Sequence, residues 1–249
     1  MRYDIPMNNL RTYGHQPFNI AIIHGGPGAP GEMAPVARKL ASDSGVQEPL
    51  QTVNSVDGQV EELKDVLEKY GDSPLILIGF SWGAWLCYIL TARYPSLVKK
   101  LILVSSGPFE EKEVLSLLSA LNSRGIMRNG FVRFGELMNK ADSFSPLPDV
   151  TGGLESNPDI YQKVWTEAGK MRSSGELLQL GNKIQCPVVA IHGDYDPHPA
   201  AGVREPLSHV LKDFRFILLE KCGHRPWFER YAQEIFYNTL RREISVARG

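Results

Sequence analysis

The chain has 249 residues, of which 43% are hydrophobic and 22% charged, and its formal net charge is −1. These values are ordinary for a globular protein, and the near-neutral charge gives no electrostatic reason to expect nucleic acid or an anionic membrane as a partner. No apolar run approaches the roughly 20 residues that span a bilayer, and the N-terminus lacks the apolar core of a signal peptide. Three scattered cysteines, Cys87, Cys186 and Cys222, argue against a disulfide framework and for a reducing, cytoplasmic location.

The first third of the chain alternates short apolar runs with helical patterns. Before Asn19 the sequence is polar and turn-rich, with at most one short strand near residues 10–13. Asn19–Ile23 is the first run that predicts a buried strand. Further along, the pattern predicts a helix over Met33–Ser42, a short strand over Leu50–Val53, and a helix over Val60–Tyr70 with Asp57 as its N-cap.

A nucleophile motif lies in the middle of this alternation. The aliphatic run Leu75–Ile78 predicts a buried strand, Gly79-Phe80-Ser81-Trp82-Gly83 follows it, and the helix-compatible run Ala84–Tyr94 comes next. G-x-S-x-G between a strand and a helix is typical of a nucleophile elbow, in which the serine occupies a strained turn and the glycines permit close backbone approach. The motif is short enough to arise by chance, but its flanking elements favour the catalytic interpretation of Ser81.

The composition changes after the next predicted strand, Lys99–Ser105. From residue 108 to 181 no buried strand is predicted, and the pattern indicates a helical insertion. Its predicted helices cover Glu111–Leu121, Gly130–Ala141, Ile160–Met171 and Glu176–Leu180, with a loop over Ser143–Pro158. We therefore expect a core of residues 1–107 and 182–249 and a helical cap of residues 108–181.

The remaining elements complete an α/β pattern. Strands are predicted over Pro187–Ile191 and Phe214–Leu219, with helices over Val203–Leu211 and Pro226–Glu243. Continuous aliphatic strands that alternate with helices predict a doubly wound, mostly parallel sheet. Ligands of such sheets bind beyond the carboxyl ends of the strands.

Three polar groups follow predicted strands in the order that a serine triad needs. Ser81 would be the nucleophile, Asp196 the orienting carboxylate and His224 the base. Asp194 is the alternative acid, although its place directly after Gly193 also suits a turn residue. His198 competes with His224 as the base, but a triad acid and base normally come from different loops.

The loop His24-Gly25-Gly26-Pro27-Gly28 would supply part of an oxyanion hole. A tetrahedral oxyanion needs about two preorganised backbone N–H donors. We expect one from Trp82, the residue after the nucleophile, and the other from Gly26. No metal or organic cofactor is implied by the sequence.

With the order Ser81, Asp196, His224 and this glycine-rich loop, the chain resembles the α/β-hydrolase superfamily over about residues 19–245. His24-Gly25-Gly26-Pro27-Gly28 together with Gly79-Phe80-Ser81-Trp82-Gly83 is similar to the prolyl iminopeptidase branch. That resemblance implies removal of an N-terminal residue, with cap glutamates that bind the substrate's amino group. The candidates for that role in the predicted cap are Glu136, Glu155, Glu167 and Glu176, and no motif assigns it to any of them. The short region before Asn19 implies that the first strands of the family's sheet are missing or reduced.

We therefore expect a serine hydrolase that cleaves an ester, an amide or a short peptide through an acyl-enzyme. Dehalogenases and epoxide hydrolases of the same superfamily use an aspartate nucleophile, and Ser81 argues against both. An aminopeptidase of the iminopeptidase type is the first alternative. A binding protein of this fold that has lost catalysis is the second.

Overall fold

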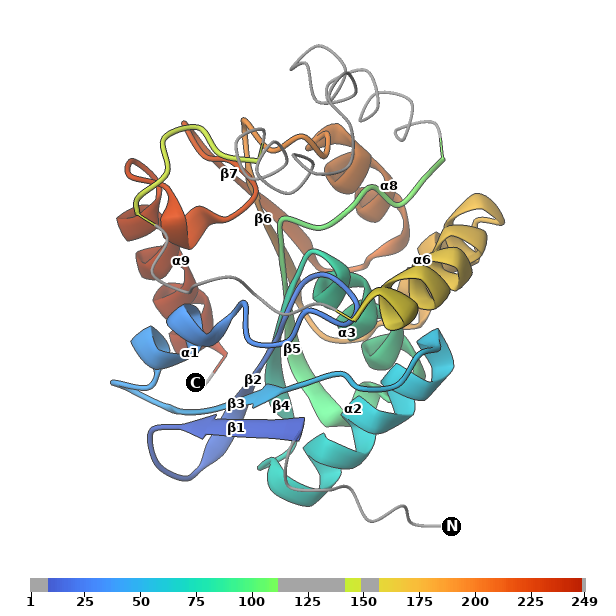
Figure 1. Cartoon of the computed structure of the whole chain (residues 1–249), viewed down its shortest axis with the longest axis horizontal. Helices are drawn as coiled ribbons and strands as arrows, with labels where there is room; N and C mark the ends of the chain where they lie inside the picture. The colour runs from blue at the N-terminus through green and yellow to red at the C-terminus, as the bar shows by residue number, and fades with distance from the viewer. Residues whose placement is uncertain (1–8, 112–141, 149–156, 248–249) are drawn as a thin grey trace.

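A single sheet of seven strands organises the part of the chain that the structure describes, residues 9–111, 142–148 and 157–247 of a computed structural model (Figure 1). The spatial order is β1-β3-β2-β4-β5-β6-β7. All neighbours are parallel except β1 and β3, which pair antiparallel. The bounds are Leu10–Tyr13 (β1), Phe18–Ile23 (β2), Gly45–Pro49 (β3), Leu75–Phe80 (β4), Val98–Val104 (β5), Val188–Gly193 (β6) and Phe214–Leu219 (β7). The predicted doubly wound, mostly parallel sheet is thus confirmed.

Helices cover both faces of the sheet. The α-helices are Ala34–Leu40 (α1), Val56–Tyr70 (α2), Trp82–Arg93 (α3), Pro158–Ser173 (α6), Glu176–Gln179 (α7), Ala201–Val210 (α8) and Gln233–Val246 (α9). Short 3₁₀ turns cover Pro95–Leu97, Leu180–Lys183 and Pro226–Phe228. In Figure 1, α1 and α9 lie on one side of the sheet and α2, α3, α6 and α8 on the other.

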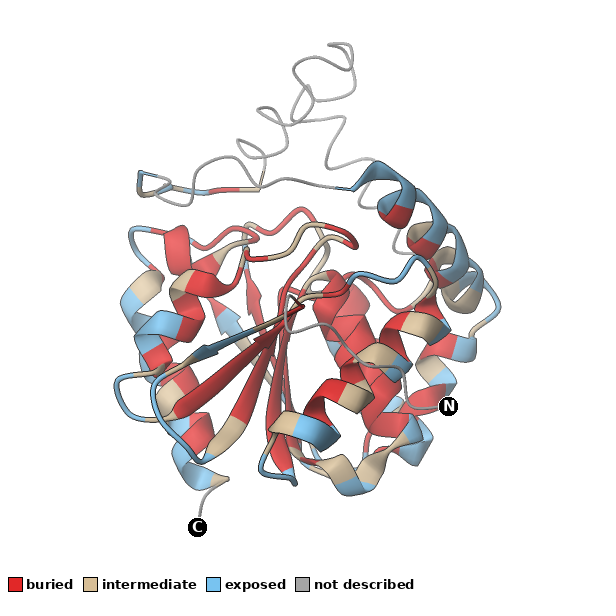
Figure 2. Ribbon diagram, turned by 60° about the horizontal axis from the view of Figure 1, so that its bottom comes forward, coloured by how far each residue is buried: buried red, intermediate tan, exposed pale blue. Residues whose placement is uncertain are grey.

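Alternation along the central strands explains this two-sided packing. Ile76 and Ile78 of β4 join a cluster with side chains of α1 and α9, whereas Leu75 and Leu77 join a cluster with α2, α3 and α8. Both faces of these strands are therefore buried, as a continuous aliphatic run predicts (Figure 2). Helix α3 is buried along almost its whole length because α2 and the 3₁₀ turn Leu180–Lys183 pack against it, and Trp165 of α6 contacts Trp82 and Trp85. Such a helix is apolar on all sides rather than on one stripe.

Three local predictions are wrong. The strand predicted over Leu50–Val53 lies instead at Gly45–Pro49, where buried Gln47 and Glu48 conceal the strand from an apolar pattern. Gln47 donates to the carbonyl of Tyr70, and Glu48 accepts from the Tyr13 hydroxyl at 2.7 Å. Each side chain thus has one hydrogen-bond partner, while Gln47 Oε1 and Glu48 Oε1 have none among the described residues.

The other two corrections concern helix ends. Ser55, not Asp57, caps α2, since its hydroxyl accepts from the amide of Gly58 at 3.2 Å. The helix predicted over Pro226–Glu243 is broken: a 3₁₀ turn ends at Phe228, Glu229 pairs as an isolated bridge with Pro146, and α9 begins at Gln233. The two helices predicted within residues 112–141 lie outside the described residues.

Candidate active site

The turn after β4 holds Ser81 in a backbone conformation that few residues other than glycine adopt. Its φ is 51° and its ψ is −114°. A Cβ on Gly79 would lie 2.2 Å from the carbonyl oxygen of Gly83, and one on Gly83 would lie 2.5 Å from the carbonyl oxygens of Ile23 and His24. Both glycines are therefore required by close backbone packing, and this packing holds the strained serine in place. Ser81 caps the N-terminus of α3, where free N–H groups favour negative charge.

The groups expected to form an oxyanion hole lie beside this turn. Trp82 is the first residue of α3, and neither its amide nor that of Gly26 donates a hydrogen bond to another described residue. Gly26 has a φ of 36°, a region that favours glycine. The two amides are therefore available to an external acceptor, as an oxyanion hole requires.

His24 supports the loop that carries Gly26. Its buried ring is 2.6 Å from the Gly25 carbonyl oxygen through Nδ1, and Nε2 accepts from the amide of Gln51 at 3.3 Å. This pair of contacts requires a neutral ring with the proton on Nδ1. Burial lowers the pKa of His24 to about 4, so the neutral form prevails at neutral pH.

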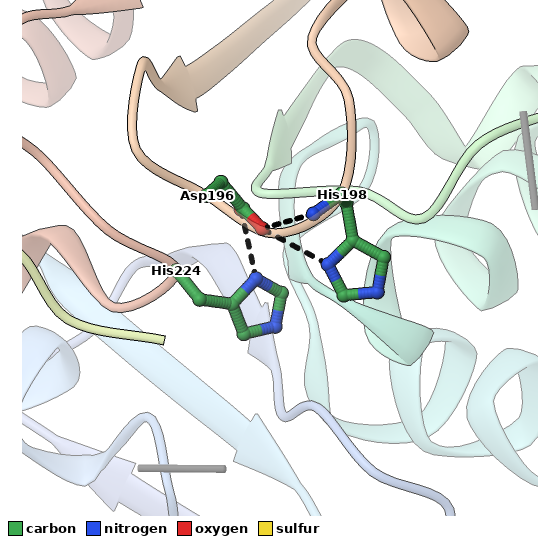
Figure 3. Close-up of side chains that lie close together, drawn as sticks. All are labelled: Asp196, His198 and His224. Atoms are coloured by element: carbon green, nitrogen blue, oxygen red, sulfur yellow. Dashed lines mark hydrogen bonds and ion pairs between the residues drawn. The ribbon is translucent and has the colours of Figure 1, made fainter. Parts of the chain in front are cut away.

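A carboxylate and an imidazole from two further strand ends meet at the same edge of the sheet. Asp196 follows β6 and His224 follows β7, and the Asp196 carboxylate lies 2.8 Å from Nδ1 of His224 (Figure 3). Asp194 faces elsewhere and accepts from the amide of Cys222 at 3.1 Å. Of the two acids weighed from the sequence, the structure therefore brings Asp196 to the histidine and uses Asp194 to connect the two loops.

His198 contacts the other oxygen of the same carboxylate. Asp196 Oδ1 accepts from the His198 amide at 2.9 Å and lies 3.0 Å from His198 Nδ1. The rings of His198 and His224 lie 4.7 Å apart at a 36° tilt, side by side in Figure 3. A third ring, that of buried His192, lies 3.6 Å from Asp196 Oδ2. Both histidines weighed as the base therefore contact the Asp196 carboxylate through Nδ1, each on a different oxygen.

These contacts set the charges of the pair. Burial alone would raise the pKa of Asp196, but the three histidines outweigh it and hold that pKa well below its ordinary value. Burial alone would lower the pKa of His224, but the Asp196 carboxylate outweighs it and raises the pKa to about 9. Asp196 is thus a carboxylate that stabilises the protonated imidazole, as the acid of a triad does.

Phe80 joins the serine turn to the histidine loop. Its ring lies 4.8 Å from that of His224 and 4.7 Å, edge-on, from that of Trp227. The imidazole therefore packs against the residue that immediately precedes Ser81. The Ser81 hydroxyl makes no hydrogen bond within the described part of the chain. The hydrogen bond between a catalytic serine and its base is often long without substrate and shortens when substrate binds.

The same cluster contains the donor types of a metal site. Asp196, His198 and His224 each offer a ligand atom, and these atoms lie within 4.8 Å of one another. In the structure both Nδ1 atoms are directed at the carboxylate. These two contacts account for the placement of both imidazoles beside Asp196.

The described cap glutamates do not gather around Ser81. Glu167 accepts from the amide of Val56 at 2.7 Å, and Glu176 is exposed in the first turn of α7. Glu136 and Glu155 lie outside the described residues. Glu167 and Glu176 therefore give no support to the amino-group site that the iminopeptidase resemblance implies.

Two residues near the base were missed by sequence reasoning. The Asp142 carbonyl accepts from the His224 amide at 2.6 Å, and buried Glu229 accepts from the Gly223 amide at 2.9 Å. Asp142 lies between the predicted helix Gly130–Ala141 and the predicted loop Ser143–Pro158, and Glu229 lies in the first turn of the predicted helix Pro226–Glu243. No local signal distinguishes either from an ordinary helical acid, because their partners are about 80 and 85 residues away in the sequence.

Comparison with known proteins agrees with the fold. A family model described as the alpha/beta hydrolase fold matches residues 42–121. The structure of a candidate lipase from Acinetobacter baumannii AYE superimposes with a TM-score of 0.73 at 19% identity and covers 98% of this chain and 90% of its own. The chain therefore has the α/β-hydrolase fold, and the two findings support membership of that superfamily.

The curated relatives have differing names, and this chain covers only part of their length. Epoxide hydrolase 4 of Mus musculus is 26% identical over 72% of this chain and 56% of its own length. Pimeloyl-[acyl-carrier protein] methyl ester esterase of Neisseria meningitidis serogroup C is 24% identical over 68% of this chain and 69% of its own. The chain thus spans little more than half of the first relative. Among the described residues, no helix is both long and apolar enough to cross a membrane.

Proposed function

We propose that this protein is a serine hydrolase that cleaves a carboxylic ester or amide of a small substrate. The observation that carries the proposal is the pairing of Asp196 with His224 at 2.8 Å, with the imidazole packed against the residue before Ser81. A buried carboxylate–imidazole pair next to a strained serine has the chemistry of a nucleophile with its base and orienting acid.

The reaction follows from these groups. Ser81 Oγ attacks the substrate carbonyl while His224 Nε2 takes the hydroxyl proton, and Asp196 stabilises the imidazolium that forms. The amides of Trp82 and Gly26 bind the oxyanion. Collapse breaks the ester or amide bond, and the alcohol or amine leaves with the proton from His224. Water then attacks the acyl-enzyme with His224 as base and releases the acid and free Ser81.

An ester is the favoured substrate class. The Neisseria relative is by its name a methyl ester esterase. Two described cap glutamates have other partners: Glu167 accepts from the amide of Val56, and Glu111 accepts from Arg172. An aminopeptidase would need a carboxylate that faces the serine. A serine at the elbow also differs from the aspartate nucleophile that the family resemblance implies for epoxide hydrolases.

The test is a paired rate assay of the wild type and Ser81→Ala. We expect turnover of short p-nitrophenyl esters, labelling by a fluorophosphonate, and loss of both in the variant. Ser208→Ala is the matched control, because Ser208 lies on the exposed face of α8 and its hydroxyl donates to the Glu205 carbonyl.

Other outcomes would redirect or refute the proposal. Preferential turnover of prolyl, alanyl or leucyl naphthylamides would establish an aminopeptidase. A folded wild type that neither turns over any of these substrates nor reacts with the fluorophosphonate would favour a binding protein of this fold.

A further inference from the structure

A buried carboxylate joins the histidine loop to a segment from the insertion. Glu229 is 1% exposed, and its side chain accepts from the amides of Phe144 at 2.7 Å, Ser145 at 2.8 Å and Gly223 at 2.9 Å. Within the described part of the chain no lysine or arginine pairs with it. All its partners are therefore backbone N–H groups from two segments about 80 residues apart in the sequence.

Residues 142–148, hereafter the strap, lie along the histidine loop. The amide of Leu147 donates to the Phe228 carbonyl at 2.7 Å, and the amide of Arg230 donates to the Ser145 carbonyl at 3.0 Å. The strap is the yellow-green segment near α9 in Figure 1. Glu229 lies at its centre, since Pro146 and Glu229 also form a backbone bridge.

The strap and Glu229 together hold two consecutive amides at the base. The Gly223 amide donates to Glu229, and the His224 amide donates to the Asp142 carbonyl at 2.6 Å. A Cβ on Gly223 would lie 2.0 Å from that carbonyl oxygen and 2.6 Å from the Glu229 carboxylate. The backbones are thus in close contact, and the position of the His224 Cα depends on both partners.

The three backbone amides around the Glu229 side chain require a carboxylate. Three N–H donors converge on the side chain, and a carboxylate offers acceptors only, on two oxygens. Hydrogen bonds of this charge-assisted kind are roughly twice as strong as neutral ones. A glutamine would direct its own NH₂ group at one of the donors and leave a buried N–H without an acceptor, which is costly.

We propose that Glu229 is a positioning residue that fixes His224 for catalysis and couples its placement to the strap. This rests on the proposed serine-hydrolase function. The carboxylate does not touch the substrate; it acts through the Gly223 amide and through the strap amides that hold Asp142 beside the His224 amide. Release of the strap therefore moves the base away from Ser81.

The test compares Glu229→Gln with Glu243→Gln. Glu243 is a matched control because it is also a buried carboxylate, 1% exposed, but it pairs with Lys100 at 2.8 Å and with Arg215. Lys100 lies near the start of β5, whereas the candidate site lies beyond the opposite ends of the strands. Both variants lose a buried charge, and only one of them adjoins the base.

We expect kcat for a p-nitrophenyl ester to fall roughly 10- to 100-fold in Glu229→Gln, since a 1 Å misplacement can cost about 100-fold. KM should stay within about threefold, and Glu243→Gln should retain the wild-type kcat at a temperature where circular dichroism shows both variants folded. The amides of Phe144, Ser145 and Gly223 should exchange with deuterium faster in Glu229→Gln alone. Wild-type kcat and wild-type exchange in that variant would overturn the proposal, as would an equal loss of kcat in both variants.

The test remains decisive if Glu229→Gln does not fold and if the wild type is inactive. If Glu229→Gln does not fold, Gly223→Ala takes its place, because its Cβ would push the strap from the loop with Glu229 intact, and unchanged kcat would refute the coupling. If the wild type shows neither turnover nor fluorophosphonate labelling, the serine-hydrolase proposal fails on its own. The exchange of the three amides then decides whether Glu229 holds the two segments together.

Discussion

Replacement of Asp196 by asparagine is the sharpest probe of the carboxylate–histidine pair. The substitution keeps the size of the side chain and removes the charge that faces His224 at 2.8 Å. An asparagine can also present its NH₂ group to Nδ1, which favours the tautomer in which Nε2 carries the proton and cannot act as a base.

The structure sets the scale of the effect. The carboxylate overcomes burial and raises the pKa of His224 from 6.5 to about 9. At 1.36 kcal/mol per pH unit, this corresponds to about 3 kcal/mol of stabilisation of the imidazolium. Asp196 is the main carboxylate that opposes the effect of burial, and Asp142 and Glu32 add smaller contributions. We therefore expect kcat, and with it kcat/KM, to fall roughly 10⁴-fold, the size of the effect when a triad aspartate is replaced by asparagine.

The pH profile supplies a second readout. The base must be neutral to accept the serine proton, so wild-type kcat/KM should rise with pH toward a plateau above about 9. In Asp196→Asn burial remains and the charge is gone, so the acid limb should move below 6.5. The measurement is kcat/KM for a p-nitrophenyl ester between about pH 5 and 10, corrected for spontaneous hydrolysis.

Asp194→Asn is the matched control. Asp194 lies on the same loop, but its carboxylate accepts from the Cys222 amide, and the oxygen of an asparagine can do the same. We expect kcat/KM within a few-fold of the wild type and an unchanged acid limb. A large loss in Asp194→Asn with little in Asp196→Asn would refute the assignment of the acid.

Two further predictions concern stability. Gly83→Ala should lower the free energy of unfolding, measured in urea, by about 3 kcal/mol, because its Cβ would meet two carbonyl oxygens at 2.5 Å. The same variant should not be labelled by a fluorophosphonate. Gly169→Ala is the control: nothing lies within 4 Å of its Cβ, so it should raise the free energy of unfolding by about 0.5–1 kcal/mol. His24 has a pKa lowered from 6.5 to about 4, so the unfolded state takes up a proton first and stability should fall by about 3 kcal/mol between pH 6.5 and 4. His24→Gln, which cannot be protonated, should lack that part of the slope in urea titrations, and an identical slope would contradict the assignment.

The raised pKa of His224 acts in a different pH range. A group whose pKa is higher in the folded state stabilises fully below its unfolded value, and that stabilisation is lost as the pH rises through about 9. The two histidines together therefore favour a stability maximum near pH 6.5.

The central strands and the mostly parallel character of the sheet could be predicted from sequence, because they depend on local apolar runs that alternate with helices. Leu75–Phe80 and Val188–Gly193 are apolar runs buried on both faces, which any parallel sheet requires. The edge at Gly45–Pro49 could not be predicted in this way. Gln47 donates to the Tyr70 carbonyl and Glu48 accepts from the Tyr13 hydroxyl. These partners are distant in the sequence, so no local pattern predicts that the two polar side chains are buried.

The candidate site could likewise be predicted from the sequence only in part. Spacing and order along the chain were enough to nominate Ser81, Asp196 and His224, since each follows a strand and the carboxyl ends of parallel strands share one edge of the sheet. The choice between Asp194 and Asp196 needed the direction of each carboxylate, and the second contact of His198 on Asp196 needed the loop conformation.

Glu229 marks the limit of what the sequence by itself determined. The sequence specifies which strands are buried, and hence which loops converge at the edge of the sheet. Only the tertiary structure decided that the Pro226–Glu243 region breaks after Phe228 and turns one of its acids toward the strap. The physical reason is that a buried carboxylate is set by donors from distant segments, which meet only when the chain has folded.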